Sequence, residues 1–418
     1  MNHRKILIAV LSGAILLSGC SSPMTGAGDL MKSVVAAERP ANPPLPAADF
    51  TDAVTSFSLR LFQASLSDRQ EIFLSPASVY LALAMTMNGA ENETLAEMRE
   101  ALSSSALEEA LINEGSRDWM TLLSQSGEKT ELFISNALWI REGYPINQAF
   151  LKRNADYYGA AAYALDFSNP SNIDIINQWV RQATRDKIDK IIDDIDPDVM
   201  MYLMNAISFK ADWATPFNPE SNQEGLFKTP QGDETVIYMN RTDRIERIQD
   251  NEVNGVWLPY EDDVFAFFAL MPDSSVNLNE WAADLTVDEF SALLNKREPV
   301  SITLTFPKFE VTYEDSLLNE LSALGVQQAF SDVADFSRMN EQDRSDLFIS
   351  EIKHKTYCRV DEKGTEAAAV TSVEMRLTSM PVAEETLVFD HPFLYGIMDV
   401  QTGIPLFLGT MEKPEFTD

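Results

Sequence analysis

Cysteine and histidine are scarce in this chain of 418 residues, which has two cysteines and three histidines. With so few of these side chains, a zinc site built from spaced histidines and cysteines is nearly excluded, and no metal or cofactor is expected. The sequence also lacks the His-Glu-x-x-His, Gly-x-Ser-x-Gly and Gly-x-x-x-x-Gly-Lys motifs and the dinucleotide-binding glycine pattern. The residues therefore give no sign of catalysis.

Basic residues are also few, because 32 Lys and Arg stand against 65 Asp and Glu and leave a formal net charge of −33. Such a field repels nucleic acid, so no nucleic-acid partner is expected. The acidic residues are scattered along the chain, which indicates a solvated surface rather than an acidic tail. The hydrophobic content of 45% is ample for a large core.

The first twenty residues, MNHRKILIAVLSGAILLSGC, combine a basic start with an apolar run that ends at Leu17. A run of this length is typical of an export signal, because a membrane-spanning helix needs about 20 apolar residues. Ser18-Gly19 followed by Cys20 resembles the bacterial lipobox, in which the cysteine is lipidated and becomes the mature N-terminus. We expect residues 1–19 to be a lipoprotein signal peptide and Cys20 to anchor the exported chain to a bacterial membrane, on its periplasmic or cell-surface face. An ordinary signal peptide with an incidental cysteine is the alternative.

The rest of the chain divides into a short linker and a long globular part. Residues 20–47 are rich in Ser, Pro, Gly and Ala and are predicted to form a flexible tether. From residue 48 to 418, helical spacing of apolar residues dominates the early part and strand-like alternation the later part. Because strands and helices do not alternate regularly, this order predicts a single α+β domain. Helices are expected over 172–192 and 314–326, and a strand over 300–311.

The stretch Glu362–Pro381, EKGTEAAAVTSVEMRLTSMP, fits two kinds of secondary structure. Thr365 can cap a helix whose first turn holds three alanines, which are good helix formers. Every second residue from Thr365 to Leu377 is instead small or apolar, which is typical of a strand with one buried face. These inward residues begin small and grow larger, as a strand that slides into a tight slot requires. Both interpretations stay open.

Seven segments, in order along the chain, resemble the serpins. They are FLSPASVYLALAMTMNGAENET, INQWV, LMNAISFKADW, TFPKFEV, HKTYCRVDEKGTEAAA, the overlapping DEKGTEAAAVT, which resembles the serpin reactive-loop hinge, and FDHPFLYGI with TGIPLFLGT. The resemblance covers essentially all of residues 49–418. It implies a serpin fold of three β-sheets and eight or nine helices, a monomer without cofactors, and an exposed reactive loop at about 362–386.

The resemblance also implies a function. It implies that the protein is not an enzyme but an irreversible suicide-substrate inhibitor of serine endopeptidases, with cysteine endopeptidases as a further class. A target protease attacks the loop and forms an acyl-enzyme, and the cleaved loop then inserts as a new strand of the main sheet. Small hinge residues distinguish inhibitors from other members of the family. A non-inhibitory surface binding or adhesion lipoprotein on the same fold is the alternative.

Two groups of residues receive roles from the resemblance alone. The hinge comprises Glu362, Gly364, Thr365, Glu366, Ala367, Ala368, Ala369, Val370 and Thr371. The shutter and breach regions, which govern the opening of the main sheet, comprise Ser75, Asn205, His354, Trp213 and Lys308. Within them, Lys308 is expected to form an ion pair with Glu362.

Two counts place the scissile bond differently. Counting forward from Gly364 gives Thr378-Ser379, whereas counting back from Pro392 gives Pro381-Val382. We prefer the forward count, because insertion needs a fixed strand length from the hinge while the far side is only a connection. The loop is then about three residues longer than is common in the family.

The residue before the bond predicts the target class. Thr378 favours a protease with a small or unselective specificity pocket, which is typical of elastase-like and subtilisin-like enzymes. Cleavage after Arg376 or Leu377 would instead favour trypsin-like, chymotrypsin-like or cysteine proteases.

Overall fold

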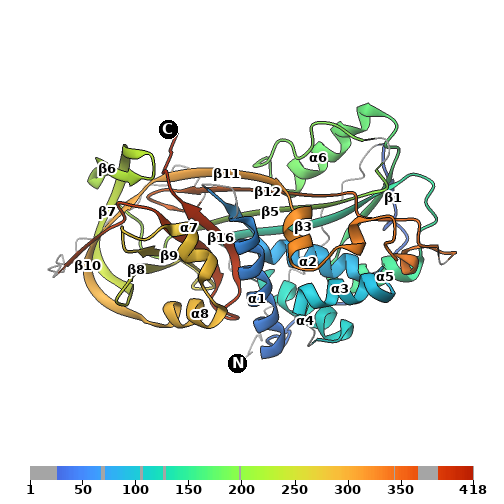
Figure 1. Cartoon of the computed structure of the whole chain (residues 1–418), viewed down its shortest axis with the longest axis horizontal. Helices are drawn as coiled ribbons and strands as arrows, with labels where there is room; N and C mark the ends of the chain where they lie inside the picture. Colours follow the sequence, from blue (N-terminus) through green and yellow to red (C-terminus); the bar gives the residue numbers. More distant parts are fainter. Residues whose placement is uncertain are drawn as a thin grey trace, which may run out of the picture.

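The computed structural model describes residues 26–66, 71–103, 107–125, 129–196, 199–342, 344–365 and 385–417. The α-helices of these ranges are α1 (Ala48–Ser65), α2 (Pro76–Met87), α3 (Asn92–Ser103), α4 (Glu109–Leu123), α5 (Gln148–Tyr158), α6 (Ile173–Ala183), α7 (Leu278–Asp284), α8 (Val287–Asn295) and α9 (Leu318–Ala323). Short 3₁₀ turns are η1 (Pro170–Asn172), η2 (Pro219–Ser221), η3 (Gln328–Phe330) and η4 (Ser337–Met339). Figure 1 shows α2 to α5 on one side of the long strands and α6 on the other side.

The long strands belong to a seven-stranded sheet. Its members, in spatial order, are β1 (Gly28–Asp29), β4 (Ala161–Leu165), β3 (Thr130–Arg141), β5 (Met201–Asp212), β13 (Gly364–Thr365), β12 (Glu351–Val360) and β11 (Phe309–Ser316). Strand β5 is buried along nearly its whole length. Its unbroken apolar run is explained by helices on both faces, with α2 against one core cluster and α6 against the other.

The remaining strands form a nine-stranded sheet. Its members are β14 (Glu385–Val388), β10 (Arg297–Pro307), β7 (Gly232–Gln249), β8 (Val253–Pro259), β9 (Phe265–Pro272), β15 (Phe393–Asp399), β16 (Pro405–Met411) and β2 (Phe73–Leu74) in order, with β6 (Gln223–Thr229) paired to β7. Strand β7 pairs with β10 along much of its length and with β8 near its end. Hydrogen bonds therefore join two of the three expected sheets through β7.

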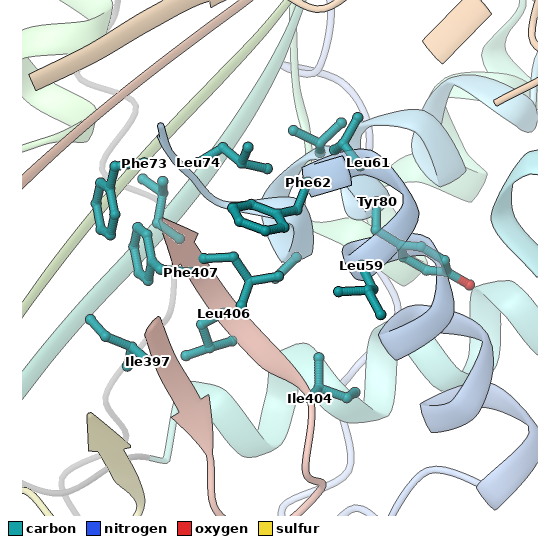
Figure 2. Close-up of a cluster of buried hydrophobic side chains, with 14 of the residues drawn as sticks. Leu59, Leu61, Phe62, Phe73, Leu74, Tyr80, Ile397, Ile404, Leu406 and Phe407 are labelled. Atoms are coloured by element: carbon teal, nitrogen blue, oxygen red, sulfur yellow. The ribbon is translucent and has the colours of Figure 1, made fainter. Parts of the chain in front are cut away.

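The main hydrophobic core lies where α1 and α2 cover β16. Figure 2 shows Leu59 and Phe62 of α1 directed toward Leu406 and Phe407 of β16. The Phe407 ring also stacks on Phe73, with ring centroids 5.1 Å apart. Because burying one such side chain stabilises a fold by about 1.5–3 kcal/mol, this cluster holds the helices firmly on the sheet.

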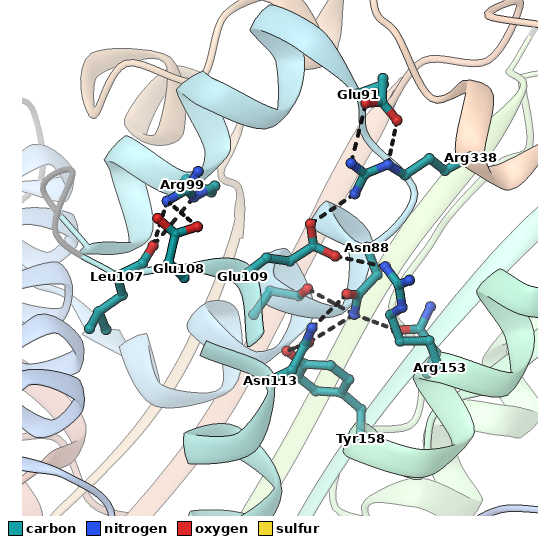
Figure 3. Close-up of polar contacts among 12 residues, drawn as sticks. Asn88, Glu91, Arg99, Leu107, Glu108, Glu109, Asn113, Arg153, Tyr158 and Arg338 are labelled. Carbon is teal, nitrogen blue, oxygen red and sulfur yellow. Dashed lines mark hydrogen bonds and ion pairs between the residues drawn. The ribbon is translucent and has the colours of Figure 1, made fainter. Parts of the chain in front are cut away.

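Charged side chains link the helices on the α2 side of the sheet. Arg338 donates to Glu91 and, at 2.8 Å, to Glu109, which also accepts from Arg153 at 2.7 Å (Figure 3). Beneath them, Asn88 at the end of α2 binds amide groups of α4 and α5. The network joins α4, α5 and the turn before α3 to η4.

Three expected elements differ from the structure. The helix expected over 172–192 ends with α6, because Arg185 and Asp186 have φ angles of 50° and 63°, which a right-handed helix does not allow. The strand expected over 300–311 is divided at Lys308 into β10 and β11. In the helix expected over 314–326, only α9 is helical, because residues 314–316 pair with β12 instead.

The segment 26–41 also differs from the expected flexible tether. Gly28 and Asp29 pair with β4, and the backbone amide of Ala37 donates to Asp156 at 2.6 Å. Apolar side chains within the segment pack against the core, namely Leu30, Met31 and Val34. Composition alone did not reveal this contact, because these few apolar residues lie among the Ser, Pro, Gly and Ala that dominate the segment. Among the described residues, no helix has the length and apolarity needed to cross a membrane.

Candidate functional site

The first two residues of the hinge segment lie inside the seven-stranded sheet. Strands β5 and β12 run parallel and pair directly over Tyr202–Ala206 and Glu351–Lys355. Beyond that stretch β13 lies between them, with Thr365 opposite Ala211 of β5 and opposite Val360 of β12. Strand β13 is antiparallel to both neighbours. The sheet is therefore open at one end, where the hinge begins, and closed at the other.

Both residues of β13 fit closely between the neighbouring strands. A Cβ atom on Gly364 would lie 2.0 Å from the carbonyl oxygen of Ala211, so no other residue fits there without moving a strand. Thr365 is 1% exposed, and its hydroxyl shares a hydrogen bond with the Tyr260 hydroxyl. Burial raises the pKa of Tyr260 well above its ordinary value, although the bond to Thr365 lowers it, so the hydroxyl stays neutral.

Trp213 fixes the turn that leads into β13. Its ring stacks on Tyr260 with centroids 4.8 Å apart, and its indole Nε1 donates to the carbonyl oxygen of Asp361 at 2.9 Å. The backbone amide of Trp213 donates to the carbonyl oxygen of Lys363 at 2.7 Å. Trp213 therefore holds the turn through two hydrogen bonds, and its ring stacks on Tyr260 in the core.

The ion pair between Lys308 and Glu362 is present at the same place. Lys308 Nζ lies 3.0 Å from Glu362 Oε1, and the two side chains are 10% and 11% exposed. The side-chain amide of Asn222 also donates to Glu362. Burial alone would raise the pKa of Glu362, but hydrogen bonds from Asn222, from its own backbone amide and from Lys308 outweigh it and lower the pKa. The pair is therefore nearly buried, and removing one partner costs more than the loss of an exposed surface pair does.

A buried polar network lies deeper in the sheet, where β5 and β12 pair directly. Asn205 and His354 are direct partners in that register. The backbone amide of Ser75 donates to His354 Nε2 at 3.1 Å, so the proton of the neutral ring lies on Nδ1, which donates to Asn205 Oδ1 at 3.1 Å. Burial lowers the pKa of His354 to about 4, against the opposing effect of Asp315. The ring is therefore neutral at physiological pH.

Other donors complete this network. Ser75 caps α2 and donates from its hydroxyl to the carbonyl oxygen of Leu406 at 2.8 Å. The Asn205 amide donates to Asn136 Oδ1 at 2.6 Å and to the carbonyl oxygen of Ser78 at 3.0 Å. These bonds connect α2, β3, β5 and β12. A strand placed between β5 and β12 has to break the contact between His354 and Asn205.

The structure thus brings together the described residues of the expected site as two groups. Lys308, Trp213, Glu362, Gly364 and Thr365 gather where the hinge begins, and the second group is the buried network around His354. Several other candidates lie outside the described residues, namely Cys20, Glu366, Ala367, Ala368, Ala369, Val370, Thr371, Arg376, Leu377, Thr378, Ser379 and Pro381. In the described ranges, no group of His, Cys, Asp and Glu side chains is arranged to hold a metal ion.

Comparison with known families agrees with this geometry. A family model described as "Serpin (serine protease inhibitor)" matches residues 52–414. The chain belongs to the serpin family. An uncharacterized serpin-like protein of Methanosarcina acetivorans is 30% identical over 88% of this chain and 87% of its own length. An alpha-1-antitrypsin homolog of Cyprinus carpio is 32% identical over 78% of this chain and 86% of its own length.

Solved structures show which conformation the fold adopts. The thermophilic serpin tengpin in its native state has a TM-score of 0.86 at 35% identity, covering 93% of this chain and 100% of tengpin. Tengpin in its latent state has a TM-score of 0.76, covering 88% of this chain and 98% of tengpin. The present serpin is thus more similar to the native form. The serpin fold expected from the sequence is confirmed.

Sequence reasoning missed four polar residues of the site: Tyr260, Asn222, Ser78 and Asn136. Ser78 and Asn136 gave a signal in the sequence, because each is a polar residue at the start of an apolar run, SVYLALAM and NALWI. Tyr260 and Asn222 gave no such signal. They come from loops far from the hinge in sequence, and only the fold brings them to it.

Proposed function

We propose that this serpin is an irreversible suicide-substrate inhibitor of serine endopeptidases, with cysteine endopeptidases as a further class. The observation that carries the proposal is the position of β13 between β5 and β12, antiparallel to both. An inhibitor of this kind has to add its cleaved loop to the sheet at this place. The direct pairing of β5 and β12 beyond β13 supports a native state that still has room to accept a strand.

In the proposed reaction, the protease nucleophile attacks the carbonyl carbon of the scissile bond. The peptide C–N bond breaks, the new amine takes a proton from the general acid of the protease, and an ester or thioester joins the loop to the enzyme. The segment after Thr365 then enters the sheet and gains ladder hydrogen bonds on both sides. Because each such bond contributes on the order of 1 kcal/mol, insertion of residues 366–377 outweighs the loss of the short β5–β12 pairing.

The proposed scissile bond is Thr378-Ser379, and the proposed target is an elastase-like or subtilisin-like serine protease. Incubation of residues 21–418, which keep the segment that pairs with β4, with a protease panel, followed by a denaturing gel, tests the function. We expect a covalent complex, and mass spectrometry of the released C-terminal peptide should find Ser379 at its start. Cleavage of the loop without a complex and without loss of protease activity would contradict inhibition and favour the non-inhibitory binding or adhesion function.

A substitution at Thr365 tests the insertion step separately. Thr365→Arg places a charge at a side-chain position that is 1% exposed, which should block the first buried position and convert the inhibitor into a substrate. Thr365→Ser keeps the hydroxyl that meets Tyr260 and is the matched control. Full trapping of protease by Thr365→Arg would show that insertion between β5 and β12 is not the mechanism.

We also propose that the protein is a bacterial lipoprotein, monomeric and anchored through Cys20 on the periplasmic or cell-surface face of a membrane. The complete lipobox-like sequence before Cys20 supports this anchor. Two or more acyl chains hold a protein stably on a membrane, whereas one chain does not. Expression with a radiolabelled fatty acid should label the wild type, and Cys20→Ser should remove both the label and the membrane association. A labelled Cys20→Ser protein would contradict the anchor.

A further inference from the structure

The C-terminal tail, residues 413–417, lies across the edge of the seven-stranded sheet beside the hinge. The backbone amide of Glu310 on the edge strand β11 donates to the carbonyl oxygen of Glu415 at 2.7 Å. The guanidinium of Arg359 on β12 donates to the carbonyl oxygen of Thr417 at 3.1 Å. The tail is therefore joined by its backbone to the two strands on one side of the place where β13 enters the sheet.

One side chain of the tail contacts two cations at this place. Lys308 Nζ lies 4.0 Å from the centroid of the Phe416 ring, and Arg359 Cζ lies 4.1 Å from the same centroid. The ring also borders a cavity of about 370 Å³ between the tail and β7. The geometry is that of a double cation–π contact, in which the negative face of an aromatic ring attracts nearby positive charge.

Both cations also bind carboxylates that determine the geometry of the hinge. Lys308 pairs with Glu362, and Arg359 binds Glu310 at 3.0 Å and lies 3.8 Å from Asp361. Asp361 and Glu362 are the two residues that lead into the turn before β13. The Phe416 ring thus contacts both cations beside their carboxylates and lowers the cost of holding two positive charges around one partly buried ring.

We infer that the C-terminal tail is a positioning element for loop insertion, and that Phe416 holds Lys308 on Glu362 and Arg359 on the β11–β12 edge. Through these contacts the tail keeps the hinge turn and the neighbouring strands in place until the loop is cleaved. Loss of the ring should free Lys308 and ease the parting of β5 from β12. The inference rests on the proposed loop insertion but not on the identity of the target protease.

The test follows spontaneous insertion of the uncleaved loop, which needs no protease. Wild-type protein is incubated at a fixed elevated temperature, and the fraction converted to a form of raised thermal stability is measured over time. Phe416→Leu keeps apolar bulk but removes the aromatic face, and it should convert about tenfold faster than the wild type, as expected for the loss of two cation–π contacts. Phe416→Tyr keeps the face and should convert at the wild-type rate.

Two further proteins make the test specific. Phe330→Leu makes the same chemical change at a half-buried ring on η3, which contacts α3, and should leave the conversion rate unchanged. In an Arg359→Met background, the effect of Phe416→Leu should shrink to about threefold, because one of the two cations is gone. A folded variant is expected because Arg359 is only partly buried and methionine keeps its apolar stem. Lys308→Met gives the complementary comparison where it folds.

The outcomes separate this inference from the proposed function. If Phe416→Leu converts no faster than the wild type, or if Phe416→Tyr is as fast as Phe416→Leu, the tail does not act through the aromatic face and the inference is wrong. In either case, covalent complexes between the wild type and protease would leave the proposed function standing. If the wild type neither converts nor traps any protease, the proposed function fails instead.

Discussion

Acidification should weaken this serpin through a single buried side chain, His354. Its pKa is lowered from an ordinary value of 6.5 to about 4, chiefly because burial disfavours the charged ring. Protonation would add a second proton to the imidazole ring, at Nε2. In the native structure this nitrogen accepts a hydrogen bond from the backbone amide of Ser75, and the added proton would break that bond. The native state therefore resists a proton that the unfolded chain accepts readily.

Proton linkage determines the direction in which stability changes with pH. Between about pH 6.5 and pH 4 the unfolded state binds more protons at His354 than the native state does, so stability is lost as the pH falls through this range. From a folded pKa of about 4 and an unfolded value of 6.5, the loss between pH 7 and pH 5 is about 2 kcal/mol. At a slope of roughly 2 kcal/mol per molar, the urea midpoint should fall by about 1 M.

Glu412 titrates in an overlapping range with the opposite sign. Burial and the nearby Glu71 raise its pKa from 4.5 to about 7, so its contribution to stability increases as the pH falls from 7 toward 4.5. The wild type must therefore be compared with His354→Gln, which does not titrate but leaves Glu412 in place. The measurement is the difference in urea midpoint between the two proteins at pH 7 and at pH 5, after equal incubation times because native serpins are kinetically trapped. A difference that is the same at both pH values would refute a buried neutral His354.

Two further substitutions test the same sheet. Ser75→Ala removes the hydroxyl that caps α2 and donates to Leu406, and the melting temperature should fall in line with a loss of about 1–3 kcal/mol; an unchanged melting temperature would contradict the role of this cap. Gly364→Ala places a Cβ atom 2.0 Å from the carbonyl oxygen of Ala211 and should displace β13, which hydrogen exchange would detect as lost protection at Thr365. Equal protection of Thr365 from exchange in the wild type and in Gly364→Ala would show that the sheet accommodates the methyl group without displacing β13.

Much of the fold could be predicted because local pattern and burial agree. Helix α2 is apolar on every side, begins at Ser75-Pro76 and is completely buried, and β5 is a continuous apolar run buried under helices on both faces. Predictions failed where tertiary contacts override local preference. Residues 314–316 have the spacing of a helix but continue β11 against β12. The segment 26–41 has the composition of a linker yet pairs with β4.

The site was predicted less completely than the fold. Family resemblance pointed to Lys308, Glu362 and His354, and the structure places each beside a partner that explains its burial. It could not supply Tyr260 or Phe416, because these residues come from a loop and from the chain terminus, where no periodic pattern exists. Their contacts depend on the arrangement of β11, β12 and β13, which only a folded chain provides.

The register of β13 explains why a threonine at position 371 suits the proposed insertion. If the strand continues beyond Thr365 in the same register, Thr371 comes to lie opposite Asn205 on one side and opposite His354 on the other. Insertion then separates the two residues whose side chains now bind each other at 3.1 Å. A threonine hydroxyl can both donate and accept, so it can satisfy groups that an alanine at this position would leave buried without partners. The proposed insertion therefore requires small side chains near Thr365 to begin, and a small polar side chain at Thr371 to replace the contact that it would break.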